Sequence, residues 1–141
     1  MTENVIAREI VDAAFRIHTR LGPGLLESVY VTVLAYELGR RGLGVLREQA
    51  IPIVYEGVRI DTGFRADLVV EDKVIIEVKS VENLAPVHKK QLLTYPRLAD
   101  KRLGLLINFH VVLIKDGIAR VVNGLEDDFH AKSPSRQELR P

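Results

Sequence analysis

Three ionisable side chains interrupt a part of the sequence that otherwise has the apolar character of a buried sheet. Asp67, Glu77 and Lys79 lie in two apolar runs joined by a charged turn at residues 71–73. Successive side chains of a strand point to opposite faces, so Glu77 and Lys79 share one face. With a three-residue loop, the antiparallel register places Asp67 opposite Glu77 and gathers all three side chains on one patch of sheet. With a two-residue loop, Asp67 would instead pair with Ile76 and lie on the other face.

This patch predicts a site for a divalent metal ion. Like charges directly opposite each other destabilise a sheet, so the two carboxylates need a compensating cation. Carboxylate oxygens suit Mg²⁺ and Mn²⁺, and a nearby lysine can orient a metal-bound water or neutralise charge on a phosphate. The competing interpretation is an exposed strand in which polar and apolar residues simply alternate. We favour the metal site because the apolar neighbours of Glu77 indicate a central strand, where charged side chains are rarely buried without a partner.

A second group of candidate residues lies on the predicted helices. Glu27 falls in a first helical turn, where an acid either favours the helix dipole, completes a capping box or reaches a site. Gln91 and Tyr95 are four residues apart and share a helix face, either as a half-buried polar seam or as contacts to a phosphate or nucleobase. His88 precedes the lysine pair 89–90, which is either a phosphate-binding patch or a solvated face. Spacing alone leaves these alternatives open.

Composition narrows the class of protein. The chain has 141 residues, 47% of them apolar, with 20 Lys and Arg against 19 Asp and Glu. The net charge of +1 gives no global signal for nucleic acid, so any basic surface must be local. The absence of cysteine excludes disulfides and thiolate metal sites and favours the cytoplasm. No apolar run approaches the ~20 residues that span a bilayer, and the first residues do not resemble a signal peptide.

The elements that must position these residues are two helices, a sheet and a crossover helix. Apolar spacing predicts helices over residues 4–21 and 25–41, separated by a Gly-Pro-Gly breaker. A third helix over 82–99 precedes a strand at 103–109, which makes that strand a parallel neighbour of the strand that carries Glu77. The other expected strands cover residues 45–53, 53–55, 58–64, 111–114 and 118–122, with a bulge or an edge at Pro52 and a hairpin turn at 115–117.

The predicted fold class is therefore α/β, a mixed central sheet flanked by helices. We expect one domain over residues 1–124 and a polar tail over 125–141 that is partly disordered. Pro96 lies inside the third predicted helix, where proline costs ~3 kcal/mol. It should kink or end the helix and could turn Tyr95 away from the site.

Several of these motifs resemble a known family. Residues 24–30, Gly-Leu-Leu-Glu-Ser-Val-Tyr, match G-x-x-E-x-x-Y, the signature of the GxxExxY family of small prokaryotic proteins. Asp67 with Glu77-Val78-Lys79 resembles the core of the PD-(D/E)xK nuclease superfamily, with Ala66 in place of the motif's proline. Residues 91–95 resemble the Q-x-x-x-Y motif of its RecB-like exonuclease branch. The resemblance covers residues 5–123.

The resemblance implies a restriction-endonuclease-like core and a Mg²⁺- or Mn²⁺-dependent site. Asp67 and Glu77 would be the principal metal ligands, with Glu27 and the Val78 carbonyl completing the set, and Lys79 would be the catalytic lysine. The residues implied to support the site or to position substrate are Gln91 and Tyr95, to which we add His88.

We therefore expect a metal-dependent nuclease that hydrolyses phosphodiester bonds, with DNA favoured over RNA as its partner and no membrane association. One alternative is a weakly catalytic nucleic-acid-binding or accessory module that works with a partner. Another is a purely structural or oligomeric protein whose acids are paired internally. A homodimer through the edge of the predicted 111–122 hairpin is a further expectation.

Overall fold

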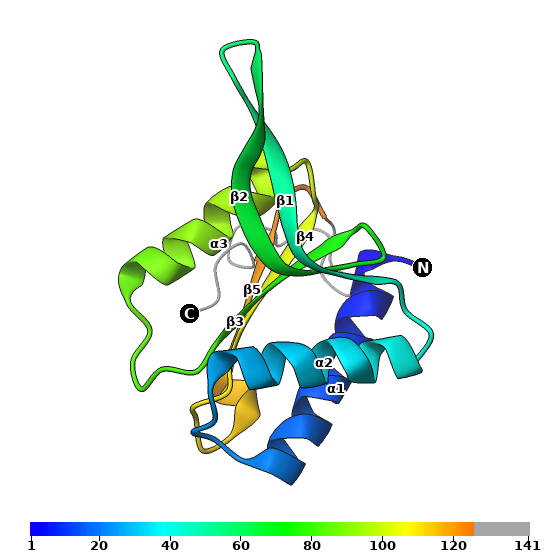
Figure 1. Ribbon diagram of the computed structural model, residues 1–141, viewed down its shortest axis with the longest axis vertical. Coiled ribbons are helices and arrows are strands. Elements are labelled where there is room, and N and C mark those ends of the chain that lie inside the picture. The colour runs from blue at the N-terminus through cyan, green and yellow to red at the C-terminus, as the bar shows by residue number, and fades with distance from the viewer. Residues whose placement is uncertain (126–141) are drawn as a thin grey trace.

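Two helices precede the sheet in the computed structural model, which describes residues 1–125. They are α1 (Glu3–Leu21) and α2 (Glu27–Arg40), and the Gly-Pro-Gly breaker lies between them as predicted (Figure 1). Gly22 has φ +71° and Gly24 has φ +98°, backbone conformations that favour glycine. The second helix begins two residues later than expected, at Glu27.

The sheet has five strands in the order β1-β2-β3-β4-β5. Only β3 and β4 are parallel, and the helix α3 (Pro86–Leu98) forms the crossover between them, as predicted. The other neighbouring pairs are antiparallel, so the sheet is mixed. The strands are β1 (Val45–Tyr55), β2 (Val58–Val70), β3 (Val74–Lys79), β4 (Leu103–Asn108) and β5 (Ile118–Val122).

The register between β2 and β3 decides the geometry of the site. Val70 pairs with Val74 and Leu68 with Ile76, so the loop has three residues, 71–73. The two-residue alternative, which would have moved Asp67 to the other face, is excluded. Continuing the same register places Asp67 opposite Glu77.

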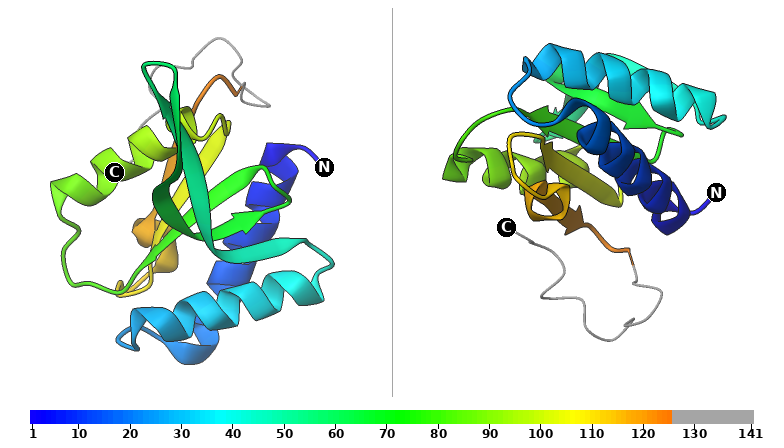
Figure 2. Two further views of the ribbon diagram at one scale, coloured as in Figure 1. Left: turned by 45° about the horizontal axis from the view of Figure 1, so that its top comes forward. Right: turned by 90° about the horizontal axis from the view of Figure 1, so that it is seen from below.

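Helices cover the two faces of the sheet differently (Figures 1 and 2). The face under α1 and α2 is a continuous core built from alternate residues of each strand, including Leu68, Val74, Ile76, Val78 and Leu105. The face under α3 has two smaller clusters, built around Val69 with Ile75 and around Leu92 with Leu106.

The first two strands form one long hairpin that projects beyond the rest of the sheet (Figure 1). We expected two strands that meet at Ile53, but β1 is continuous. The strand expected over residues 58–64 runs on into the segment that carries Asp67, as predicted, so β2 is continuous as well. Pro52 lies on an edge strand, at the register shift between Ile51 and Ile53, which confirms the predicted bulge or edge.

The predicted hairpin over residues 111–122 is wrong in its first half. Residues 111–113 are bends, and η1 (Ile114–Gly117) is a 3-10 helix in place of the expected strand end and turn. The segment packs back onto the end of β4 so closely that a Cβ on Gly117 would lie 2.1 Å from the Asn108 carbonyl oxygen. His18 of α1 also hydrogen-bonds the Val111 carbonyl through Nε2, at 2.8 Å. Tertiary contacts therefore replace the strand pairing that the apolar pattern suggested.

The third helix starts four residues later than expected and runs through Pro96 to Leu98. It ends two residues after the proline, where Lys101 N–H donates to the Pro96 carbonyl at 2.7 Å. The tail expected to be partly disordered covers residues 125–141. Leu125 packs against the core, and residues 126–141 lie outside the described residues. Within residues 1–125, no helix is long and apolar enough to cross a membrane.

Candidate active site

The Asp67 and Glu77 carboxylates take the place of backbone hydrogen bonds between β2 and β3 at the point where the two strands separate. The recorded strand pairing stops at Leu68 and Ile76. Beyond that point the Val78 N–H donates to Asp67 Oδ2 at 2.8 Å, and the Asp67 N–H donates to Glu77 Oε2 at 3.4 Å. Each carboxylate therefore contacts the opposite strand, which draws the two acids together.

Burial raises the pKa values of both acids. The pKa of Glu77 rises from 4.5 to about 8, chiefly because burial disfavours the charged form and further because the Asp67 charge is close. Burial also raises the pKa of Asp67, while the Val78 hydrogen bond and the charge of Lys79 oppose the rise. Without a cation, Glu77 is thus protonated at neutral pH, which removes the like-charge repulsion.

Glu27 reaches this site from the start of α2. Its charge contributes to the raised pKa of Glu77, and its side chain lines a cavity of about 400 Å³ together with Asp67. The capping-box interpretation of Glu27 is wrong, because α2 begins at Glu27 itself and Leu26 at its N-cap makes no side-chain capping bond. The position in the first helical turn still favours an acid through the helix dipole.

The loop before α2 is held in place by Tyr30, the tyrosine of the G-x-x-E-x-x-Y motif. Its ring is fully buried and stacks on Phe109 with centroids 4.3 Å apart. Its hydroxyl donates to the Gly22 carbonyl at 2.5 Å and accepts from the Leu25 N–H at 3.2 Å. The hydroxyl of Ser80, which directly follows β3, donates to the Leu25 carbonyl at 2.6 Å. These bonds tie the loop that delivers Glu27 to the strand end that carries the candidate lysine.

Of the residues on α3, Tyr95 contacts the site region. Its ring stacks on Phe64 of β2 with centroids 3.9 Å apart. Burial raises the pKa of its hydroxyl, and the nearby charge of Glu77 raises it further. The expectation that Pro96 could turn Tyr95 away from the site is therefore wrong.

The other two α3 candidates are placed differently. Gln91 is exposed, and its side chain makes no hydrogen bond within the described part of the chain. His88 caps its own helix, with Nδ1 accepting from the Ala85 N–H at 3.3 Å. Neither of them is in contact with the two carboxylates, so their role in substrate positioning remains a prediction.

Three residues near the site were not among the sequence candidates. Glu48 and Arg47 line the same cavity as Glu27, and the charge of Glu48 raises the pKa of Asp67. Glu48 has φ +48°, an irregularity in β1 that alternation of polar residues does not reveal. Arg47 donates to Thr32 Oγ1 of α2 at 3.0 Å.

Asn108 is the third residue, and it holds the chain just beyond Lys79. It is 3% exposed, and its amide both accepts from the Val81 N–H at 3.1 Å and donates to the Val81 carbonyl at 2.9 Å. Lys79 pairs with Asn108 across the parallel strands. A polar residue at the end of the apolar run 103–109 was a signal that could have identified it.

The donor set suits a hard divalent cation. Asp67, Glu77 and Glu27 supply carboxylate oxygens only, as Mg²⁺ and Mn²⁺ prefer. In residues 1–125 no three His, Asp or Glu side chains already stand in an arrangement that could hold an ion.

Comparison with known proteins agrees with the fold and the motif. A family model described as the PD-(D/E)XK nuclease superfamily matches residues 4–121. No curated protein and no solved structure matches the chain. The matched range covers α1 through the greater part of β5 and includes both carboxylates and Lys79. The chain belongs to the PD-(D/E)XK nuclease superfamily.

Proposed function

We propose that this protein is a metal-dependent nuclease that hydrolyses phosphodiester bonds, with DNA as the favoured substrate. The observation that carries the proposal is the pairing of Asp67 with Glu77 across β2 and β3. Lys79 follows on the same strand two residues after Glu77. In a member of a nuclease superfamily, this combination favours hydrolysis over a structural role.

Each residue has a proposed part in the reaction. Asp67 and Glu77 would hold Mg²⁺ or Mn²⁺, with Glu27 and the Val78 carbonyl as further ligands. The ion would supply charge neutralisation at the phosphate and a water of lowered pKa. Lys79 would orient the attacking water or stabilise the negative charge that grows on the phosphate.

The substrate would lie along the surface next to this site. A substrate contact by Tyr95 is supported by its stacking on Phe64 and by the effect of the nearby Glu77 charge on its pKa. A substrate contact by Arg47 is supported because Arg47 lines the same cavity as Glu27. Gln91 and His88 would contact the nucleic acid from α3. The finer assignments to the GxxExxY family and the RecB-like branch are part of this proposal and rest on the motifs alone.

The proposal is tested by incubating the full chain with single- and double-stranded DNA and RNA in Mg²⁺, Mn²⁺ or EDTA. We expect cleavage that needs the metal and is lost in Glu77→Ala and in Lys79→Ala. Glu82→Gln and Lys115→Met are matched controls, because both residues are exposed and neither is a candidate for the site, and they should keep the activity. Cleavage that persists in both site variants would refute the assignment.

A second candidate is a nucleic-acid-binding or accessory module of the same fold that works with a partner. The near-neutral net charge of +1 and the small size favour it, because a nuclease that works alone usually needs more basic surface or an added domain. Salt-dependent binding of DNA or RNA without turnover, in the same assays, would support this alternative over the nuclease.

A further inference from the structure

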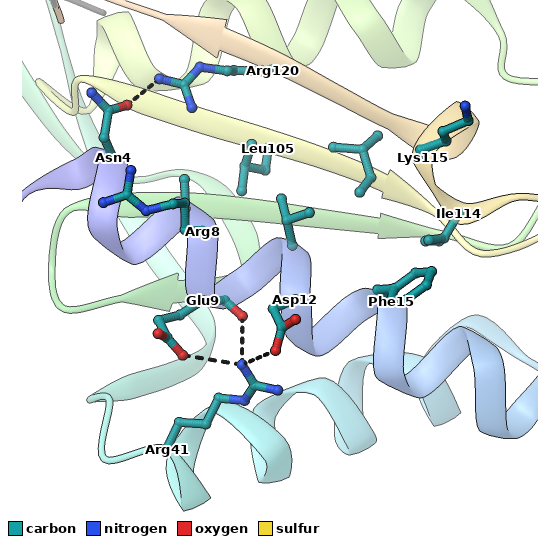
Figure 3. Close-up of a pocket in the computed structure, with 13 residues that line it drawn as sticks. Asn4, Arg8, Glu9, Asp12, Phe15, Arg41, Leu105, Ile114, Lys115 and Arg120 are labelled. Atoms are coloured by element: carbon teal, nitrogen blue, oxygen red, sulfur yellow. Dashed lines mark hydrogen bonds and ion pairs between the residues drawn. The ribbon is translucent and has the colours of Figure 1, made fainter. Parts of the chain in front are cut away.

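Leu26, directly before Glu27, is an apolar side chain exposed at the proposed active site. It is 74% exposed and lines the same cavity of about 400 Å³ as Glu27 and Asp67. Exposed apolar side chains also occur elsewhere: Phe15, at 60% exposed, lies on the α1 wall of a groove whose lining includes none of the candidate site residues (Figure 3). Because single exposed apolar side chains are common on protein surfaces, exposure alone does not give Leu26 a role.

The loop holds Leu26 in this exposed position at a disadvantage to the helix that follows. The Leu25 N–H donates to the Tyr30 hydroxyl at 3.2 Å, and the Leu25 carbonyl accepts from the Ser80 hydroxyl at 2.6 Å. Leu26 is the N-cap residue of α2 and makes no side-chain capping bond. Ser, Thr, Asn and Asp are preferred at an N-cap, and Leu is among the poorest choices. A rigidly held, exposed leucine where a polar residue would stabilise the helix better indicates a functional rather than a structural role.

The charges that line the cavity restrict which part of a nucleic acid can lie against Leu26. Among the described residues that line it, Arg47 is the only cation, and the acids are Glu27, Glu48 and Asp67. Phosphates would therefore be attracted to Arg47 and to the metal ion that the acids would hold. The side chain of Leu26 has no hydrogen-bond donor or acceptor, so it suits an uncharged, flat and largely apolar group, which in a nucleic acid is the face of a base.

We propose that Leu26 contacts the face of a nucleobase beside the cleaved phosphodiester, and that this contact makes the nuclease selective for single-stranded nucleic acid. The inference rests on the proposed nuclease function. In a duplex the bases are stacked and present only their edges in the grooves, whereas an unpaired base offers its face. A duplex would first have to unstack a base before it could make the same contact, which is energetically unfavourable.

The test compares the natural full chain with Leu26→Ser and Leu26→Met, on a labelled single strand and on the duplex of the same sequence. Fluorescence anisotropy in EDTA at low salt measures binding, and kcat/KM in Mg²⁺ measures cleavage. The natural protein should bind the single strand at least about tenfold more tightly than the duplex. Leu26→Ser should weaken single-strand binding roughly five- to tenfold and duplex binding less than about twofold, with parallel changes in kcat/KM. Leu26→Met keeps an apolar side chain and should stay within about twofold of the natural protein.

Urea denaturation of the same samples separates a substrate contact from a structural role. Because serine is a favoured N-cap residue, Leu26→Ser should unfold at the same urea concentration as the natural protein or at a higher one. A leucine needed for the fold would give the opposite result. Phe15→Ser is the matched control, since it also removes an exposed apolar side chain, and it should leave the binding of both substrates unchanged.

Four results would overturn the inference: a natural protein that prefers the duplex, unchanged single-strand binding in Leu26→Ser, an equal loss on both substrates, or an equal loss in Phe15→Ser. Weaker binding together with unfolding at lower urea concentration would also overturn it, in favour of a structural leucine. A natural protein that sediments as a dimer, with Leu26→Ser as a monomer, would assign Leu26 to a contact with a second copy instead.

The failure of this inference and the failure of the proposed function are distinguishable. If the inference fails but Mg²⁺-dependent cleavage is present and is lost in Glu77→Ala, the nuclease function stands without the selectivity of Leu26. If the natural protein neither binds nor cleaves any nucleic acid, both are refuted.

Discussion

The two faces of β3 show how one short strand serves two purposes. On the face under α1 and α2, Val74, Ile76 and Val78 are all fully buried. On the opposite face, Ile75 is fully buried but Glu77 and Lys79 are only partly so. Neighbouring residues of one strand therefore differ completely in chemical character.

The difference follows from what covers each face. On the first face, Val74, Ile76 and Val78 belong to the core cluster that also contains the buried side chains of α1 and α2. On the second face, Tyr95 of α3 and Ala99, the residue that follows this helix, pack on the cluster around Ile75. Glu77 and Lys79, at the end of the strand, are less covered. Charged groups are tolerated at this end of β3 because it is partly exposed. The raised pKa of Glu77 reflects the remaining unfavourable effect of burial on its charged form.

The largest effect is expected from placing a charge on the closed face. Val78→Asp buries a carboxylate with no partner at a position that is 0% exposed. We expect it to lower the free energy of unfolding by roughly 4 kcal/mol or more, enough to unfold many domains of this size. Urea denaturation followed by circular dichroism measures this, and the adjacent Glu77→Gln is the matched control that should stay folded. If Val78→Asp is as stable as the natural protein, the two faces of β3 do not differ in their tolerance of a charge.

The next effect is on catalysis rather than on stability. Lys79→Met should lower kcat/KM for DNA cleavage by about 10³-fold, because it removes the cation that faces the reacting phosphate. Its free energy of unfolding should change by less than ~1 kcal/mol, since Lys79 is only partly buried. Steady-state kinetics and denaturation of the same samples separate the two effects. The exposed Lys115→Met control should change neither quantity, and retained activity in Lys79→Met would show that Lys79 has no part in the mechanism.

A smaller effect is expected from pH in the metal-free protein. Glu77 binds a proton in the folded state up to a pKa of about 8, whereas the unfolded chain releases it near 4.5. The unfolded state therefore binds fewer protons between these values, and the free energy of unfolding falls as pH rises through that window. Glu77→Gln cannot titrate, so in EDTA it should be more stable than the natural protein at pH 9, by roughly 1–3 kcal/mol, and similar to it at pH 4.

Denaturation of both proteins across that pH range tests this expectation. Glu82→Gln, an exposed acid nearby, should follow the natural protein at every pH. A stability difference that does not change with pH would mean that Glu77 does not carry the proton.

The smallest effect concerns Glu48, the acid that only the folded chain brings to the site. Its charge raises the pKa of Asp67, so Glu48→Gln should lower the pKa of Asp67. An NMR titration of the Asp67 carboxyl carbon measures the change, and Glu56→Gln, at the exposed turn of the β1–β2 hairpin, is the control. If the pKa of Asp67 stays the same or rises, Glu48 does not influence the site electrostatically. Stability should change by less than ~1 kcal/mol.

Sequence reasoning recovered much of the arrangement because strand geometry is local. The alternation of side chains and the three-residue loop at 71–73 were enough to predict Asp67 opposite Glu77, and the crossover helix was enough to predict β3 beside β4. It failed at residues 111–114, where an apolar, β-branched run does not form a strand. There the contacts of Gly117 with β4 and of His18 with Val111 outweigh strand propensity.

The pairing of the two carboxylates was thus decided by the sequence itself, since period and loop length act within a few residues of chain. What only the tertiary structure decided is which distant residues join that pair. Glu27 arrives because Tyr30 and Ser80 anchor its loop, and Glu48 arrives through an irregularity in an edge strand. Such contacts depend on the packing of whole helices and strands against each other, which is a sum of many long-range interactions. The G-x-x-E-x-x-Y motif singles out Glu27, but only this packing brings it near Asp67.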